Sequence, residues 1–156
     1  MNDNKIKSIN GTICKQLLLN SLIGLQQEKL IAYCETQYRD GYAEFSTNQF
    51  FAPFLVEFTN GEIWLLYSTN SIRTDRVCIQ QWNSYHIKNI RSNVTRAYLV
   101  VPDEILNNKK EFDIAMSYNE KICNKELFSS IDGVYIQEQI IKKIEEYGLS
   151  INKQTF

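Results

Sequence analysis

The chain has 156 residues, of which 44% are hydrophobic and 22% are charged, so we expect one folded domain over residues 1–156 rather than a disordered or collagen-like chain. Its net charge of −1 gives no bulk basic field for nucleic acid, although a local basic face remains compatible with it. The polar opening MNDNKIKSIN and the lack of a long apolar run predict a cytoplasmic protein with no membrane span.

The first part of the chain is predicted to be helical. Leucines cluster on one side of residues 12–23. In the following stretch, four apolar or aromatic positions repeat with helical spacing, and Gly41 suits the end of a helix. The sequence therefore predicts a first well-defined helix over residues 25–39.

A β-hairpin is predicted next. Two apolar runs, at 52–59 and 62–69, flank the dipeptide Asn60-Gly61, which favours a two-residue type I′ turn. With such a turn Glu57 lies opposite Trp64. Its face of the hairpin then carries Leu66 and Ser68.

A helix and a third strand follow the hairpin. Thr74 or Asp75 can cap a helix whose buried stripe is predicted to contain Ile79, Trp82, His86, Ile87 and Ile90. Residues 96–101 are predicted to form a strand that ends at Pro102. Because one helix separates this strand from strand 62–69, the two strands are expected to be parallel.

The C-terminal part is predicted to contain one helix, which Asp132 caps, which continues to about residue 146 and which stops at Gly148. Residues 107–131 give no clear pattern. The predicted fold class is α/β, with a central mixed sheet that contains the hairpin and a crossover helix and is flanked by helices.

Three stretches resemble the core of the PD-(D/E)xK nuclease superfamily, which includes many type II restriction endonucleases. They are GLQQEKLIAYCETQYRDG, PFLVEFTNG and EIWLLYSTNSIRTDRVCIQQWNSYHIK, and the resemblance covers about residues 24–102. The first is similar to the family's first helix, the second to the strand with its first catalytic acid, and the third to a strand and a Gln-Trp helix found in some restriction enzymes. The resemblance implies a restriction-endonuclease-like core.

The resemblance also implies a Mg²⁺ site with Glu57, Asp75 and Glu28 as ligands, because Mg²⁺ prefers oxygen ligands and activates water for phosphodiester cleavage. Arg73 or Lys88 would supply the cationic group. The chain departs from the family at residues 66–69, where neither Leu66-x-Ser68 nor Tyr67-x-Thr69 provides the expected acid-x-Lys element. DNA contacts are expected from the set Arg73, Arg76, Gln80 and Gln81.

The leading hypothesis is a Mg²⁺-dependent endonuclease that hydrolyses double-stranded DNA in a restriction system, as a homodimer or with a second subunit. The alternative is a non-catalytic DNA- or protein-binding module with a degenerate nuclease fold. A third reading is a small-molecule domain of unrelated α/β type. Each site residue also has an ordinary structural role open to it: Asp75 as a helix cap, Glu57 as an outward strand residue, Glu28 as a solvated surface charge.

Overall fold

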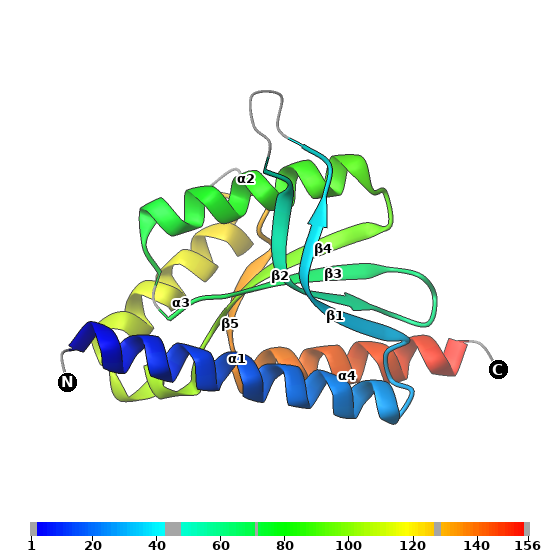
Figure 1. Cartoon of the computed structure of the whole chain (residues 1–156), viewed down its shortest axis with the longest axis horizontal. Coiled ribbons are helices and arrows are strands. Elements are labelled where there is room, and N and C mark those ends of the chain that lie inside the picture. The colour runs from blue at the N-terminus through cyan, green and yellow to red at the C-terminus, as the bar shows by residue number, and fades with distance from the viewer. Residues whose placement is uncertain (1–2, 43–47, 71, 127–128, 155–156) are drawn as a thin grey trace.

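A computed structural model describes residues 3–42, 48–70, 72–126 and 129–154, with side chains from Ile13 onward in the first helix (Figure 1). Helices and strands alternate along most of the chain. In chain order the elements are α1 Asp3–Gln27, β1 Tyr33–Asp40, β2 Phe50–Glu57, β3 Ile63–Ser68, α2 Thr74–Ile90, β4 Val94–Val101, the short 3₁₀ helix η1 Asp103–Asn107, α3 Lys109–Cys123, β5 Gly133–Ile136 and α4 Gln137–Gln154.

The strands form one mixed sheet in the order β1-β2-β3-β4-β5. β1 and β2 pair antiparallel, as do β2 and β3, whereas β3–β4 and β4–β5 are parallel pairs. The predicted mixed sheet, its crossover helix and the parallel pairing of the strands on either side of that helix are confirmed.

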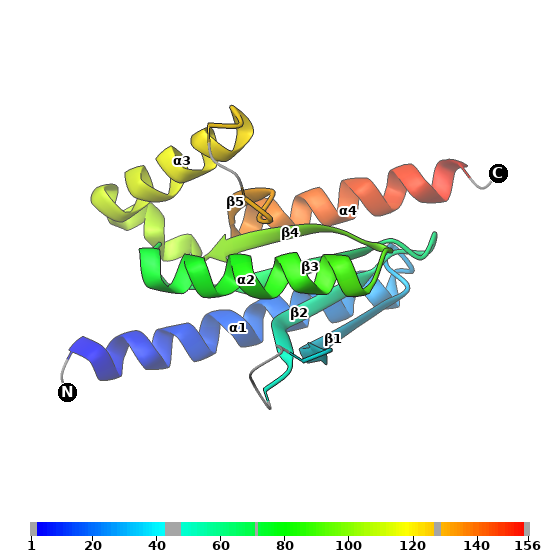
Figure 2. The ribbon, with the colours of Figure 1, turned by 90° about the horizontal axis from the view of Figure 1, so that it is seen from above.

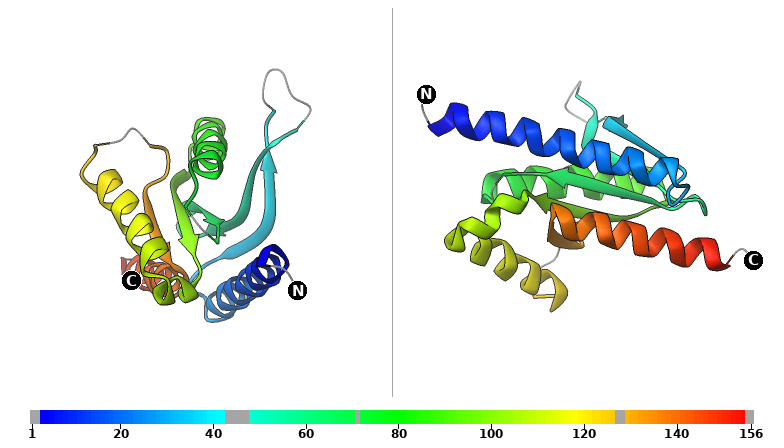
Figure 3. Two further views of the ribbon diagram at one scale, coloured as in Figure 1. Left: turned by 90° about the vertical axis from the view of Figure 1, so that its left-hand side faces the viewer. Right: turned by 90° about the horizontal axis from the view of Figure 1, so that it is seen from below.

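Helices cover both faces of the sheet (Figure 3). On one face Leu65, Leu99 and Val134 belong to a core that includes Val77 and Ile87 of α2. On the other face a second core joins side chains of the sheet to α1 and α4, with Leu18, Leu22, Trp64, Ile140 and Ile144 all fully buried. Among the described residues, no helix is both long enough and apolar enough to cross a membrane.

The largest difference from the sequence prediction lies before residue 42. The predicted helix over 25–39 is wrong, because α1 ends at Gln27 and Tyr33–Asp40 is strand β1. Lys29, whose φ is 63°, lies in the turn between the two elements. Residues 33–40 gain a ladder of backbone hydrogen bonds to β2, and this pairing overrides the helical spacing of a few apolar side chains.

The hairpin forms where it was predicted, but its turn is one residue longer. The amide of Phe58 donates to the carbonyl of Glu62, and within residues 59–61 only Gly61 has a positive φ, at 89°. A three-residue turn with glycine in that position is a common alternative to the type I′ turn. Glu57 therefore pairs with Ile63 instead of Trp64. This shift moves Glu57 to the opposite face from Leu66 and Ser68.

The C-terminal helix was also placed too early. Residues 133–136 form β5, and α4 begins at Gln137 and continues past Gly148. Gly148 is not a helix stop: a Cβ at this position would lie 2.2 Å from the carbonyl oxygen of Leu30. The glycine is needed because α4 touches the backbone of the turn after α1.

Candidate functional site

Glu57 lies at the hairpin end of the sheet. It is the last residue of β2, it is half-buried, and its carbonyl accepts a hydrogen bond from the amide of Ala32 at 2.8 Å. The pKa of the Arg91 guanidinium is raised, chiefly by its hydrogen bond to Tyr38 and to a smaller extent by the Glu57 carboxylate. The electrostatic neighbour of Glu57 is therefore an arginine just after the end of α2.

Asp75 lies beyond the other end of β3. Glu57 pairs with Ile63, the first residue of β3, whereas Asp75 follows the last residue, Ser68, by way of the segment before α2. Five steps along a strand of about 3.3 Å each separate Ile63 from Ser68 by about 17 Å. The side chain of Asp75 is 65% exposed and pairs with Arg73 at 3.3 Å.

The predicted metal site of Glu57, Asp75 and Glu28 is therefore not assembled. Glu28 is exposed in the turn after α1, and its amide donates to the carbonyl of Gly24. A Mg²⁺ ion holds its oxygen ligands at about 2.1 Å, so carboxylates at opposite ends of a strand cannot share it. The part of the chain that the structure describes also contains no group of three or more His, Cys, Asp or Glu residues that could hold a metal ion.

The end of β3 offers no replacement for the missing acid-x-Lys element. Leu66 is fully buried on the face that α1 and α4 cover. Tyr67 is buried on the other face and its hydroxyl donates to the carbonyl of Phe51 at 3.0 Å. Burial raises the pKa of Tyr67. Leu66 and Tyr67 therefore each belong to one of the two cores.

Lys88 was predicted as a cationic catalytic group, but its ammonium is occupied within the fold. It donates to the Ser130 carbonyl at 2.7 Å and to the Asp132 carboxylate at 2.8 Å. Lys88 and Asp75 are thirteen positions apart on α2, which corresponds to about 20 Å along a helix. Lys88 therefore cannot act with Asp75 on one phosphate.

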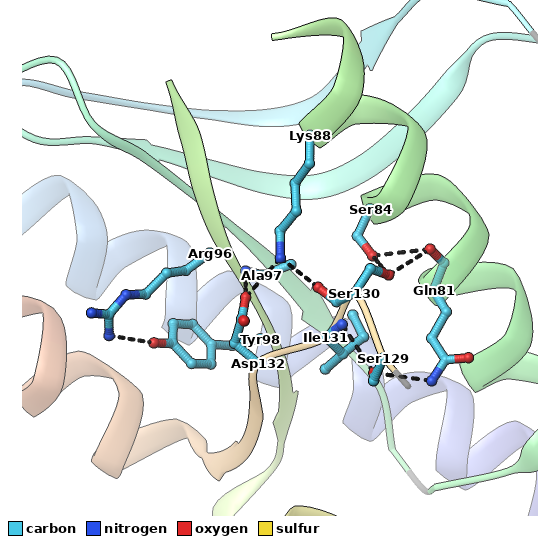
Figure 4. A network of polar contacts seen from close by, with 10 residues as sticks. All are labelled: Gln81, Ser84, Lys88, Arg96, Ala97, Tyr98, Ser129, Ser130, Ile131 and Asp132. Atoms are coloured by element: carbon cyan, nitrogen blue, oxygen red, sulfur yellow. Dashed lines mark hydrogen bonds and ion pairs between the residues drawn. The ribbon is translucent and has the colours of Figure 1, made fainter. Parts of the chain in front are cut away.

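Lys88 belongs to a polar network that ties α2 to the segment before β5 (Figure 4). Asp132 accepts hydrogen bonds from both Lys88 and the amide of Ala97. The hydroxyls of Ser84 and Ser130 lie 2.6 Å apart, and Ser130 donates to the carbonyl of Gln81 at 2.7 Å. Each of these contacts is internal, so the network holds α2 against β4 and β5.

The four predicted DNA-contacting residues divide into two pairs. Arg73 and Arg76 are exposed at the start of α2, with Arg73 paired to Asp75. Gln80 is half-buried, and Gln81 donates to the Tyr118 hydroxyl at 2.7 Å and to the Ser129 hydroxyl at 3.1 Å. The two glutamines therefore point into the molecule and do not extend the arginine surface.

α2 starts where the sequence predicted, but Thr74 and Asp75 do not cap it. The N-cap residue is Arg73, and its side chain makes no capping hydrogen bond. The predicted buried stripe is wrong at Ile79, Trp82 and Ile90, all of which are exposed. The buried positions are Val77, Ser84 and Ile87.

α2 therefore buries one polar residue, Ser84, beside Val77 and Ile87, and leaves several large apolar side chains exposed. Ser84 is fully buried, whereas Ile79 is 62% and Trp82 is 55% exposed. The sequence does contain a signal for this orientation, because Val77, Gln81, Ser84 and Lys88 also follow helical spacing. Sequence reasoning missed it because the partners of these polar side chains come from residues 129–132, some forty positions away in the chain.

Two adjoining hollows lie along α2 on the side that faces α3. Figure 2 shows these helices running beside one another in the same general direction. The larger hollow has a volume of about 570 Å³ and is lined by Ile72, Thr74, Val77, Cys78, Gln81, Asp113, Ile114, Ser117, Tyr118 and Lys121. The smaller one, about 300 Å³, is lined by Cys78, Gln81, Trp82, Tyr85, Ser129 and Ser130. Both include Cys78 and Gln81, and Ser129 and Ser130 bound the smaller one on the side away from α2; we call the two adjoining hollows together the α2–α3 groove.

Comparison of the chain with protein-family models, with curated proteins and with solved structures finds no match in any of the three. The function is therefore inferred from the chain's own geometry.

Proposed function

We propose that this chain is a non-catalytic binding module, with elements arranged in the order of a restriction-endonuclease-like core, that holds a protein partner on α2. The observation that carries the proposal is the exposure of Ile79 and Trp82 on α2, a helix in which the polar Ser84 is fully buried. Exposed apolar side chains grouped on one helix are typical of protein interaction sites. Tryptophan is among the residues that contribute most to such interfaces.

The separation of the acidic residues supports a non-catalytic role. Metal-assisted hydrolysis of a phosphodiester needs carboxylates that converge on one ion or on two closely spaced ions. Glu57 and Asp75 lie beyond opposite ends of β3, and Asp75 is paired with Arg73. The proposal therefore assigns no step of hydrolysis to these residues.

The charges on α2 favour protein over DNA as the partner. Binding to DNA depends on several cations that neutralise phosphates together. At the start of α2, Asp75 offsets the charge of Arg73, and the net charge of the whole chain is −1. The two glutamines expected to contact DNA are turned inward. An apolar helix face without a basic stripe fits a protein surface better than a phosphate backbone.

The proposal is tested by incubating the purified full chain with plasmid and phage DNA, in Mg²⁺ and in excess chelator. We expect no cleavage in either condition and no electrophoretic shift at physiological salt. Partner capture from a lysate of the source organism, compared between the wild type and Trp82→Ser, should show proteins retained only by the wild type. Discrete Mg²⁺-dependent fragments would overturn the non-catalytic proposal.

A Mg²⁺-dependent, site-specific endonuclease for double-stranded DNA is the second candidate. The observation in its favour is the order of elements: a helix, three antiparallel strands, a crossover helix and a strand parallel to the last of the three. This function would need a ligand set other than Glu28, Glu57 and Asp75. Mg²⁺-dependent cleavage that persists in both Glu57→Ala and Asp75→Ala would support an endonuclease with a different set of metal ligands.

A further inference from the structure

The outer side of α2 and the facing side of α3 form one surface with exposed apolar side chains and a recess. Ile79 and Trp82 are exposed on α2, where one side of the Trp82 ring packs edge-on against His86, and Tyr85 is also substantially exposed. The recess is the α2–α3 groove, whose smaller hollow has Trp82 itself on its rim. An exposed aromatic side chain therefore lies at the edge of a hollow on the same side of α2.

The groove is suited to an apolar occupant rather than to a polar ligand. Val77, Cys78 and Ile114 supply apolar walls. Three of its polar side chains already bond to one another, since the amide nitrogen of Gln81 donates to both Tyr118 and Ser129. An occupant gains most by removing apolar surface from water, at about 25 cal/mol for each Å².

The charges on the rim are arranged so that the surface can pair with itself. Asp113 and Lys121 both line the larger hollow from α3, and neither takes part in an ion pair between described residues. Eight positions on one helix place them about 12 Å apart. Rotation by a two-fold axis across this rim brings Asp113 of one copy toward Lys121 of the other, and the same pairing then occurs twice.

We propose that the α2–α3 surface binds a second copy of this chain in an isologous dimer. Trp82 of each copy enters the groove of its partner, and the Asp113 and Lys121 side chains of the two copies pair reciprocally across the rim. The inference deepens the proposed function by naming the protein partner, and it rests on that function.

The test is the molar mass of the full chain in solution, measured by sedimentation or light scattering over a range of concentrations. We expect a reversible dimer, and Trp82→Ser should raise its dissociation constant by about tenfold or more, as for a central aromatic anchor. Acrylamide quenching of tryptophan emission should fall as the dimer forms, because Trp64 is already buried and Trp82 becomes covered.

Leu17→Ser is the matched control, because Leu17 is a similarly exposed apolar residue on α1 and lies on the other side of the sheet. It should leave the dimer unchanged. The charge pairs are tested separately: Lys121→Asp should weaken the dimer, and the double exchange Asp113→Lys with Lys121→Asp should restore it. Circular dichroism and the urea midpoint of each variant show that it folds.

A chain that stays monomeric at every concentration would overturn the dimer, as would a dimer that Trp82→Ser leaves intact. A dimer that Leu17→Ser weakens equally would place the interface elsewhere and overturn the inference too. None of these results bears on DNA cleavage. A monomer that still captures a different protein through Trp82 would leave the proposed function standing, whereas Mg²⁺-dependent cutting would remove that function.

Discussion

At the scale of single residues, Asp132 is the acidic side chain of the polar network that ties α2 to the segment before β5. One of its oxygens accepts from Lys88 at 2.8 Å and from the amide of Ala97 at 2.9 Å. Ala97 is fully buried, whereas the carboxylate of Asp132 is 39% exposed and Lys88 is 22% exposed. Water can replace part of what either charged group loses, whereas the Ala97 amide is buried and has the Asp132 carboxylate as its acceptor.

We therefore predict that Asp132→Ala lowers the free energy of unfolding more than Lys88→Met does. Loss of the acceptor leaves a buried donor unpaired, which costs about 1–3 kcal/mol, whereas a partly exposed ion pair contributes about 1 kcal/mol or less. Urea unfolding followed by circular dichroism measures both values. Lys142→Met, at an exposed site of α4, is the control. If Lys88→Met were the more harmful change, the role of the Ala97 amide would be refuted.

The predicted site residues show, one by one, why the candidate site was predicted only in part. Asp75 and the two arginines lie at the start of α2, as the sequence indicated. The position of Glu57 depended on the turn length, because one extra residue in a hairpin moves a strand residue to the other face. The pairing of Lys88 with Asp132 joins residues 44 positions apart, and local spacing carries no information about such a contact.

At the scale of elements, α1 and α4 pack on the same face of the sheet, and Gly148 is where α4 meets the turn after α1. The nearest atom to a Cβ at Gly148 would be the Leu30 backbone oxygen, at 2.2 Å. Gly24, inside α1, has no such neighbour within 4 Å. The two glycines are therefore a matched pair for testing whether the close contact between α4 and the Leu30 backbone affects stability.

Gly148→Ala is predicted to destabilise the protein, whereas Gly24→Ala is predicted to be neutral or stabilising. Forcing a methyl group against backbone costs about 1–3 kcal/mol, because α4 or the turn must move. In an open helix position, alanine instead gains up to about 1 kcal/mol over glycine. Thermal unfolding of both variants measures the difference. A Gly148→Ala protein as stable as the Gly24→Ala protein would mean that α4 does not approach Leu30 this closely.

The elements also differ in how far sequence alone could place them. The strand predicted at 96–101 lies within β4, and the helix predicted to begin near Thr74 is α2, because both have strong local patterns. β1 was missed because its eight residues form a strand only through pairing with β2. β5 has only four residues and is defined by its pairing with β4. Short strands that depend on a distant partner have a weak signal in sequence.

At the scale of the whole molecule, the two cores include tyrosines whose ionisation the fold opposes. The pKa values of Tyr67 and Tyr98 are raised, in both cases mainly by burial. Tyr67 is 2% exposed and packs on the α2 side of the sheet, whereas Tyr98, also 2% exposed, packs on the α1 and α4 side. Ionisation of tyrosine at high pH is therefore opposed by burial in both cores.

We predict that the free energy of unfolding stays constant with respect to these tyrosines below about pH 10 and falls above it. The unfolded chain begins to lose tyrosine protons near its ordinary pKa of about 10. The folded chain keeps these protons to higher pH, so above that value it binds more protons than the unfolded chain and stability decreases as pH rises. Urea unfolding at about pH 8, 10 and 11 measures the change.

Tyr67→Phe should reduce the steepness of this alkaline loss, although it also removes the hydrogen bond to the Phe51 carbonyl and lowers stability at every pH by about 1 kcal/mol. Tyr42→Phe, at an exposed position, is the control for a general effect of removing a hydroxyl. The two effects are separable, because a lost hydrogen bond shifts the curve and a lost ionisation changes its slope. Parallel curves for wild type and Tyr67→Phe would show that Tyr67 ionises as easily in the folded chain as in the unfolded one.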